Sequence, residues 1–231
     1  MKLPPLTEGR LLQRYKRFLA DIELGSGETV TVHCPNPGSM MGLKEPGMRV
    51  WMSTSDNPKR KLPMTLEMVE ANGGLVSINT NNPNKLAEEA IRDGTIKELA
   101  AFDALKREVP YSTNSRIDIL LETSGAKTYV EVKNCHLMRT PGLTEFPDSV
   151  TARGAKHLRD LKAEYAAGNR AVMLFIIQRS DCDALATAPD IDPAYHEAFY
   201  DAAEAGVEIL CYDCHMSLED IRVRRRIPWR R

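Results

Sequence analysis

Residues 115–133 read SRIDILLETSGAKTYVEVK, and this stretch decides how the surrounding chain folds. Apolar and polar residues alternate on both sides of Ser124-Gly125, which predicts two antiparallel strands joined by a two-residue turn. In that register Ile119 lies opposite Val130. The stretch also places charged residues inside both strands, and these charges are the first indication of a functional site.

Three charged side chains fall on one face of the predicted hairpin. Because side chains alternate along a strand, Asp118, Glu131 and Lys133 share this face. The other face is apolar and is formed by Ile117, Ile119, Leu121, Val130 and Val132. Two carboxylates that face each other repel. A hard divalent cation, Mg²⁺ or Mn²⁺, would relieve the repulsion, since such ions bind carboxylate oxygens while keeping several waters.

The same arrangement has a chemical use. A cation held by Asp118 and Glu131 would activate water and stabilise negative charge on a phosphate. Lys133 would steady the attacking water or the scissile phosphate. An Asp in one strand and Glu-x-Lys in the next is the layout of a metal-dependent phosphodiesterase. The alternative is a solvated network of ion pairs on an exposed sheet face, because the pattern is short and common.

The composition is that of an ordinary globular protein. The 231 residues are 42% hydrophobic and 27% charged, enough for one large or two small domains. No apolar run is long enough for a membrane helix, and the N-terminus lacks the apolar core of a secretory signal. We therefore expect a cytoplasmic protein with no membrane partner. Five cysteines, an odd number, indicate reduced thiols.

Charge is unevenly distributed along the chain. The net charge of −1 argues against a general nucleic-acid binder, but residues 221–231, IRVRRRIPWRR, hold six arginines and no acidic residue. A tail of this kind binds phosphates even when the whole protein is nearly neutral. The alternative is an edge strand whose arginines point to solvent, since Ile221, Val223 and Ile227 keep odd spacing.

Secondary-structure signals divide the chain near residue 82. Residues 1–82 contain many short strand-like runs separated by Gly, Pro, Asn and Ser clusters, which predicts a small barrel. From residue 83 to 231, helical and strand-like patterns alternate, which predicts a mixed α/β domain. There we expect helices over 83–93, 96–105, 149–167 and 193–205, and strands over 107–111, 116–121, 128–134, 170–178 and 207–212.

Several longer stretches carry a family resemblance. The chain resembles the SfsA family, the sugar fermentation stimulation proteins, in VHCPNPGSMMGL (32–43), SRIDILL (115–121), YVEVKNCHL (129–137) and FPDSVTARGAKHLRDL (146–161). This resemblance implies an OB-like barrel followed by a PD-(D/E)XK nuclease-like domain. It also implies DNA binding without marked sequence preference and a regulatory role in maltose metabolism. The nuclease-like superfamily implies divalent-metal cleavage of phosphodiester bonds.

The nuclease-like motif departs from its usual form at one position. The proline that precedes the superfamily's aspartate is Ile117 here, and we do not count this against activity because the chemistry uses Asp118. Pro147-Asp148 follows Glu131-x-Lys133 and is therefore in the wrong order for the motif. We interpret it as the start of a helix, and the alternative is a functional role for Asp148.

Other residues are candidates for metal or phosphate contacts. The superfamily often supplies a further carboxylate from the first helix of the domain, and Glu89 could fill that role. Arg153, Lys156 and His157 share a face of the helix after the hairpin, where they could hold DNA phosphates. Arg116, beside Asp118, is grouped with them. The alternative for each is a solvated, charged surface.

The Pro/Gly-rich loop of the barrel contributes three further DNA-binding candidates. Backbone and side-chain donors around His33, Asn36 and Ser39 could meet a phosphate. The alternative is a turn that simply joins two strands.

Three functional hypotheses follow from these observations. The first is a DNA-binding protein with a divalent-metal nuclease site. The second is a non-catalytic DNA-binding regulator of sugar metabolism that keeps an inactive nuclease fold, although no helix-turn-helix is evident. The third, an enzyme acting on carbohydrate, rests on the family name alone.

Overall fold

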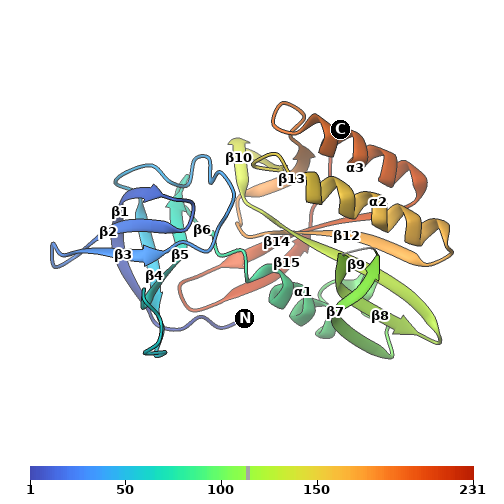
Figure 1. Cartoon of the computed structure of the whole chain (residues 1–231), viewed down its shortest axis with the longest axis horizontal. Coiled ribbons are helices and arrows are strands. Elements are labelled where there is room, and N and C mark those ends of the chain that lie inside the picture. The colour runs from blue at the N-terminus through green and yellow to red at the C-terminus, as the bar shows by residue number, and fades with distance from the viewer. Residues whose placement is uncertain (113–114) are drawn as a thin grey trace.

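A barrel occupies the N-terminal third of the chain, in a computed structural model that describes residues 1–112 and 115–231 (Figure 1). Its strands are β1 (Leu6–Tyr15), β2 (Leu19–Leu24), β3 (Thr29–His33), β4 (Arg49–Thr54), β5 (Met64–Ala71) and β6 (Gly74–Ser77). The sheet order is β3-β2-β1-β4-β5-β6, and a further β3–β5 pairing closes β1 to β5 into a five-stranded barrel, while β6 pairs with β5. Leu11, Ile22 and Leu66 belong to its separate buried core. The predicted small barrel is confirmed.

The rest of the chain forms the predicted α/β domain. Its helical elements are α1 (Pro83–Arg92), a 3₁₀ turn (Lys97–Leu99), α2 (Ala152–Ala166) and α3 (Pro193–Ala205). Its strands are β7 (Ala104–Ser112), β8 (Ser115–Thr123), β9 (Ala126–Cys135), β10 (Leu137–Thr140), β11 (Gly142–Phe146), β12 (Arg170–Ile177), β13 (Cys182–Thr187), β14 (Glu208–Met216) and β15 (Ile221–Arg226). Among the described residues, no helix is long and apolar enough to cross a membrane.

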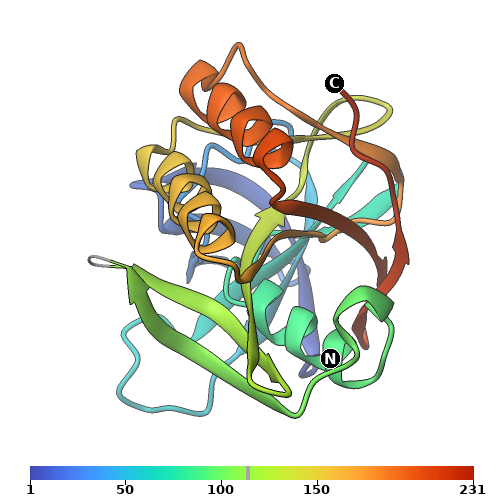
Figure 2. The same ribbon diagram turned by 90° about the vertical axis from the view of Figure 1, so that its right-hand side faces the viewer.

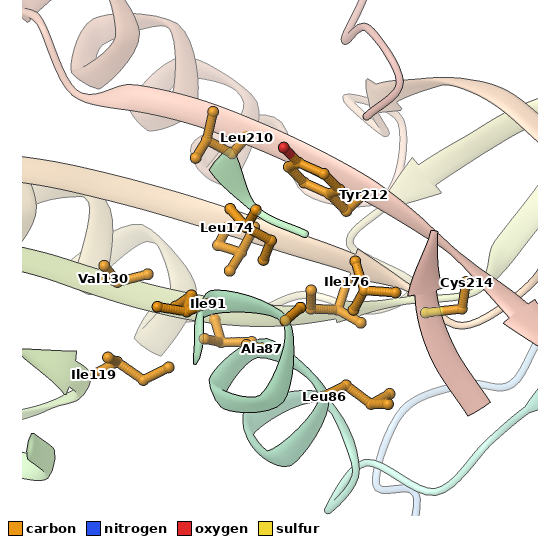
Figure 3. Close-up of a cluster of buried hydrophobic side chains, with 14 of the residues drawn as sticks. Leu86, Ala87, Ile91, Ile119, Val130, Leu174, Ile176, Leu210, Tyr212 and Cys214 are labelled. Atoms are coloured by element: carbon orange, nitrogen blue, oxygen red, sulfur yellow. The ribbon is translucent and has the colours of Figure 1, made fainter. Parts of the chain in front are cut away.

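A six-stranded sheet in the order β15-β14-β12-β9-β8-β7 is the centre of this domain, beside a small sheet of β10, β11 and β13. Strands β9, β12 and β14 run parallel, so their carboxyl ends meet at one edge. Helices α2 and α3 lie side by side on one face, and α1 covers the other (Figures 1 and 2). Figure 3 shows Ala87 and Ile91 of α1 packed among Val130, Leu174 and Leu210 of the sheet.

The hairpin of β8 and β9 forms in the predicted register, with Ile119 opposite Val130. Ser124 and Gly125 both have positive φ, 48° and 86°, as the tight primed turn requires. The β8–β9 ladder ends at the pair of Ile119 and Val130, so Asp118 lies just outside the paired region.

One residue lies on the opposite face from that expected. Ile117 packs in the core cluster under α2 and α3, whereas Ile119 packs on the α1 side. Between them the β7–β8 ladder has no pair joining Glu108 to Asp118, and Glu108 has φ of 53°. The irregular backbone lies at Glu108 of β7, opposite Asp118, where Ile117 and Ile119 pack on different faces of the sheet.

Other differences concern short elements. The helix expected over 96–105 is wrong: only the turn Lys97–Leu99 forms, because residues from 104 onward pair with β8 at the sheet edge. The strands β10, β11 and β13 were not anticipated. Helix α2 begins at Ala152, since the Thr151 side chain accepts from the Gly154 N–H and caps it. The helix over 193–205 forms as expected and is capped by Asp192.

The arginine-rich segment forms the edge strand β15, as the second interpretation of the tail predicted. Arg224 and Arg225 both pair with the buried Asp213, and Arg226 pairs with Glu98 at 2.8 Å. These internal ion pairs neutralise much of the positive charge of the segment. The tail is therefore a weaker phosphate-binding feature than its sequence indicates.

Candidate metal centre

Glu131 projects from the middle of β9 and is almost fully buried, at 2% exposure. Its Oε1 accepts a hydrogen bond from Lys133 Nζ at 2.5 Å and also contacts Nδ1 of His157. Its Oε2 is buried and has no hydrogen-bond partner among the described residues. A buried, unpaired carboxylate oxygen is costly. It therefore marks a position where a cation or an ordered water would bind.

Asp118 is held where the hairpin ladder ends. Its Oδ2 accepts a hydrogen bond from the Val132 N–H of β9 at 2.8 Å. The side chain therefore takes the place of the backbone acceptor that β8 no longer supplies. Its Oδ1 accepts from Asn84 of α1, also at 2.8 Å. Each carboxylate oxygen has two lone pairs, so Asp118 keeps capacity for a further ligand.

The pKa values of the two carboxylates are shifted in opposite directions. Burial raises the pKa of Asp118, the charge of Glu131 raises it further, and the Val132 N–H offsets part of the effect. Burial alone would also raise the pKa of Glu131, but Lys133 and His157 hold that pKa below its ordinary value. A bound cation would favour the ionised form of both groups.

His157 of α2 is the second partner of Glu131. Arg153 Nε donates to His157 Nε2 at 3.2 Å, which leaves Nδ1 protonated and directed at Glu131. Lys133 Nζ lies 3.1 Å from the same Nδ1. His157, predicted from the sequence as a DNA-phosphate contact, is a buried residue that orients Glu131. Arg153 itself is exposed beside it.

A second network ties α2 to the start of β8. Lys156 Nζ donates to Ser115 Oγ at 2.5 Å and to Asp160 at 2.6 Å. Ser115 Oγ in turn donates to Asp160 at 2.9 Å. The charge of Lys156 is therefore largely neutralised within the protein, which reduces its attraction for a phosphate. Arg116, next along β8, is exposed.

The structure does not bring Glu89 to this site. Its half-exposed carboxylate pairs with the amino group of Met1 at 2.8 Å. Asn84, from the same helix, is the residue that reaches Asp118. Five residues separate the two, which turns their side chains about 140° apart around the helix axis. The sequence did not single out Asn84, although an asparagine in the first turn of a buried helix was an available signal.

The barrel-loop candidates have structural partners. Asn36 is 1% exposed and bonds the Ile78 carbonyl and the Gly38 N–H, so it shapes the loop. Ser39 Oγ lies 3.5 Å from Asp148, across the contact between the barrel and the α/β domain. His33 lines a different surface pocket, and burial followed by the charge of Arg60 lowers its pKa.

The donor set at Asp118 and Glu131 fits a hard divalent cation. Among the described residues, no group of three or more His, Cys, Asp or Glu side chains is arranged to hold a metal. Mg²⁺ does not need such a group, since one or two carboxylates, waters and substrate phosphates complete its coordination. The free Glu131 Oε2 and the spare lone pairs of Asp118 supply oxygen ligands of that kind.

These features define a class of protein: a small β-barrel followed by a mixed α/β domain, with an Asp and a Glu-x-Lys on neighbouring strands. Comparison with known proteins identifies the family. The chain belongs to the SfsA family, because the model of the SfsA N-terminal OB domain matches residues 12–78 and that of the sugar fermentation stimulation protein RE domain matches residues 81–220. The sequence-based fold prediction and the family resemblance are confirmed.

Similar proteins cover nearly the whole chain. A sugar fermentation stimulation protein homolog of Maricaulis maris is 56% identical over 97% of both chains. A homolog of Brucella ovis is 52% identical over 97% of this chain and 94% of its own. The solved structure of Pyrococcus furiosus SfsA in complex with Ca²⁺ is 27% identical, with a TM-score of 0.89, and the match covers 100% of this chain and 98% of that one.

Proposed function

We propose that this protein binds DNA without marked sequence preference and cleaves its phosphodiester bonds in a reaction that depends on Mg²⁺ or Mn²⁺. The observation that carries the proposal is the buried Oε2 of Glu131, which has no hydrogen-bond partner among the described residues, together with Asp118, whose pKa the Glu131 charge raises. The Ca²⁺ bound by the Pyrococcus furiosus relative supports a divalent cation, and the OB domain supports a nucleic-acid ligand.

Each side chain has a defined task in this proposal. Asp118 and Glu131 would hold the cation, which supplies positive charge to the scissile phosphate and lowers the pKa of bound water. The ammonium group of Lys133 donates a hydrogen bond to Glu131 Oε1. In the reaction this ammonium group would turn towards the phosphate as negative charge develops there. His157 fixes the Glu131 carboxylate. Exposed Arg153 and Arg116 would position the DNA backbone.

A non-catalytic, DNA-binding regulator of sugar metabolism is the second candidate. It is favoured by the direct Lys133–Glu131 ion pair at 2.5 Å, because two groups that neutralise each other are also stable without a cation. The two candidates differ in how they respond to loss of a carboxylate. Cleavage requires Glu131, whereas simple binding survives its removal because one repulsive charge is lost.

The test is incubation of the protein with labelled single- and double-stranded DNA in Mn²⁺, Mg²⁺ or EDTA. We expect products with either metal for wild type and for Glu89→Gln, the control, which lies on α1 away from Asp118. Glu131→Gln and Asp118→Asn should give none. Products that persist in EDTA or in Glu131→Gln would place the chemistry elsewhere. The absence of products from wild type in both metals, with DNA binding retained, would favour the regulator.

A further inference from the structure

A second pocket lies between the barrel and the α/β domain, apart from the Glu131 site. Its volume is about 360 Å³, within the range of small-ligand sites. Thr151, before the first turn of α2, lines this pocket, whereas His157 of the same helix touches Glu131. Six residues of helix span about 9 Å. If a nucleic-acid strand is bound at the carboxylates, a neighbouring nucleotide of that strand can therefore reach this pocket.

The pocket contains a buried hydrogen-bond donor that has no hydrogen-bonded acceptor among the described residues. Asn134 Oδ1 accepts from Gln178 at 2.7 Å, so the other amide atom, Nδ2, donates to His136 Nδ1 at 3.0 Å. The proton of this imidazole is therefore on Nε2. His136 is 5% exposed, and its Nε2 has no hydrogen-bond partner among the described residues. The nearest acceptor, Asp148 Oδ2, is 3.7 Å away, too far for a hydrogen bond.

Asp148 places an acceptor beside that donor. Its carboxylate accepts hydrogen bonds from the Met40 N–H of the barrel loop at 3.1 Å and from the Ser149 hydroxyl at 3.4 Å. Burial would raise its pKa, but the facing His136 and the Met40 N–H hold that pKa below its ordinary value, so Asp148 is ionised at neutral pH. A fixed carboxylate repels a phosphate. The pocket floor therefore suits a neutral, planar group that has one acceptor next to one donor.

The walls and rim fit the same kind of group. Pro37, Pro147 and Phe146 contribute apolar surface, and Val150 at the pocket is 75% exposed. The exposed Arg17 lies on the barrel side, where its guanidinium could stack on a flat ring. Apolar walls with a few convergent polar groups are typical of a ligand site.

We infer that this pocket receives one unpaired nucleobase of the strand whose backbone lies at Asp118 and Glu131. His136 donates to the base edge, and Asp148 accepts from it. Every base carries an acceptor beside a donor on its pairing edge, so the pocket is tolerant of sequence. Because a paired base cannot present that edge, the pocket selects single-stranded nucleic acid. This inference rests on the proposed function and names its substrate class.

The experiment compares two labelled strands of equal length by fluorescence anisotropy in EDTA. One is ordinary single-stranded DNA, and the other carries abasic spacers throughout, so both present the same phosphates. We expect wild type to bind the ordinary strand about tenfold more tightly, as expected for one engaged base. Asp148→Asn and Arg17→Gln should lower this ratio at least about threefold. Arg10→Gln, an exposed arginine of β1, is the matched control for charge and should keep the ratio.

The outcomes separate this inference from the proposed function. An unchanged ratio in Asp148→Asn and Arg17→Gln, or a wild type that binds both strands equally, overturns the base pocket even if metal-dependent cleavage is observed. Arg17→Gln changes only an exposed side chain, so it remains decisive if Asp148→Asn fails to fold. A base-dependent ratio in a protein that cleaves nothing overturns the nuclease and leaves the pocket standing.

Discussion

His157 Nδ1 of α2 and Glu131 Oε1 of β9 are in direct contact, and the other oxygen of Glu131 has no hydrogen-bond partner in the part of the chain that the structure describes. The imidazole is itself oriented by Arg153, which donates to its Nε2. A carboxylate that is held at one oxygen presents the second oxygen in a fixed direction. Its side chain is already ordered, so no further conformational freedom is lost when a cation binds. The geometry therefore assigns His157 the role of orienting Glu131, the proposed metal ligand.

Replacing His157 by Gln should weaken Mn²⁺ binding about tenfold or more, because residues that orient a metal ligand have effects of this size. Isothermal titration calorimetry without DNA measures the dissociation constant directly. His215→Gln, on an exposed position of β14, is the control and should bind Mn²⁺ like wild type. Equal affinity in His157→Gln and wild type would remove His157 from the site.

Asp118→Asn should stabilise the protein by about 1 kcal/mol at pH 7 in EDTA, a common gain when a functional charge is removed. Burial and the charge of Glu131 raise the pKa of Asp118 in the folded state above its ordinary value of 3.8. The folded state therefore favours the protonated form, and wild type loses stability as pH rises through the raised pKa.

Urea unfolding of wild type and Asp118→Asn at several pH values checks this prediction. The advantage of the variant should shrink as pH falls through the raised pKa and should be lost below 3.8, where Asp118 is protonated in both states. A variant that is less stable than wild type at pH 7 would contradict the electrostatic description of the site.

Asp148 should have the opposite pH dependence. Its pKa is about 2 in the folded state against an ordinary 3.8, which corresponds to about 2 kcal/mol of stability at neutral pH. Because the pKa is lowered, this contribution is complete above 3.8 and is lost as pH falls towards 2. Asp148→Asn should lose this contribution to the free energy of unfolding, as measured by urea unfolding at pH 7. The control Asp56→Asn, at an exposed position, should be as stable as wild type. Equal stabilities of the two variants would contradict the prediction.

Gly38→Ala should destabilise the protein by about 1–3 kcal/mol, the usual cost of overpacking. A Cβ at Gly38 would collide with the Asp148 carboxylate, which holds the barrel loop through the Met40 N–H. Thermal unfolding followed by circular dichroism measures the effect. Gly25→Ala is the control, since a Cβ there meets no atom within 4 Å. A Gly38→Ala protein as stable as Gly25→Ala would show that the loop moves away freely.

The sequence predicted the parts of the fold that depend on local signals. Ser124-Gly125 set the register of the hairpin, and Asp192-Pro193 with Gly206 set both ends of α3. The helix expected over 96–105 failed because pairing with β8 at the sheet edge outweighed a weak helical pattern. Short strands such as β11 were missed, since five residues carry little periodicity.

The candidate site was predictable to the extent that alternation along β8 and β9 places its charges together. That argument brought Glu131 and Lys133 into contact, as the structure shows. It missed Asn84 and placed Ile117 on the wrong face, because the contacts of both residues depend on elements that meet only in the folded chain. His157 was selected for its helical spacing with Arg153, but its partner, Glu131, lies on another element and is evident only in the folded chain.

The most direct test of the metal site is the stoichiometry and affinity of Mn²⁺ binding, followed by electron paramagnetic resonance in wild type, Glu131→Gln and Glu89→Gln. Since no described residue bonds Glu131 Oε2, and Glu89 pairs with Met1, we expect one bound Mn²⁺ per chain in wild type and in Glu89→Gln. Binding to Glu131→Gln should be at least about tenfold weaker. Equal Mn²⁺ affinity in wild type and Glu131→Gln would contradict the assignment of the metal to Asp118 and Glu131.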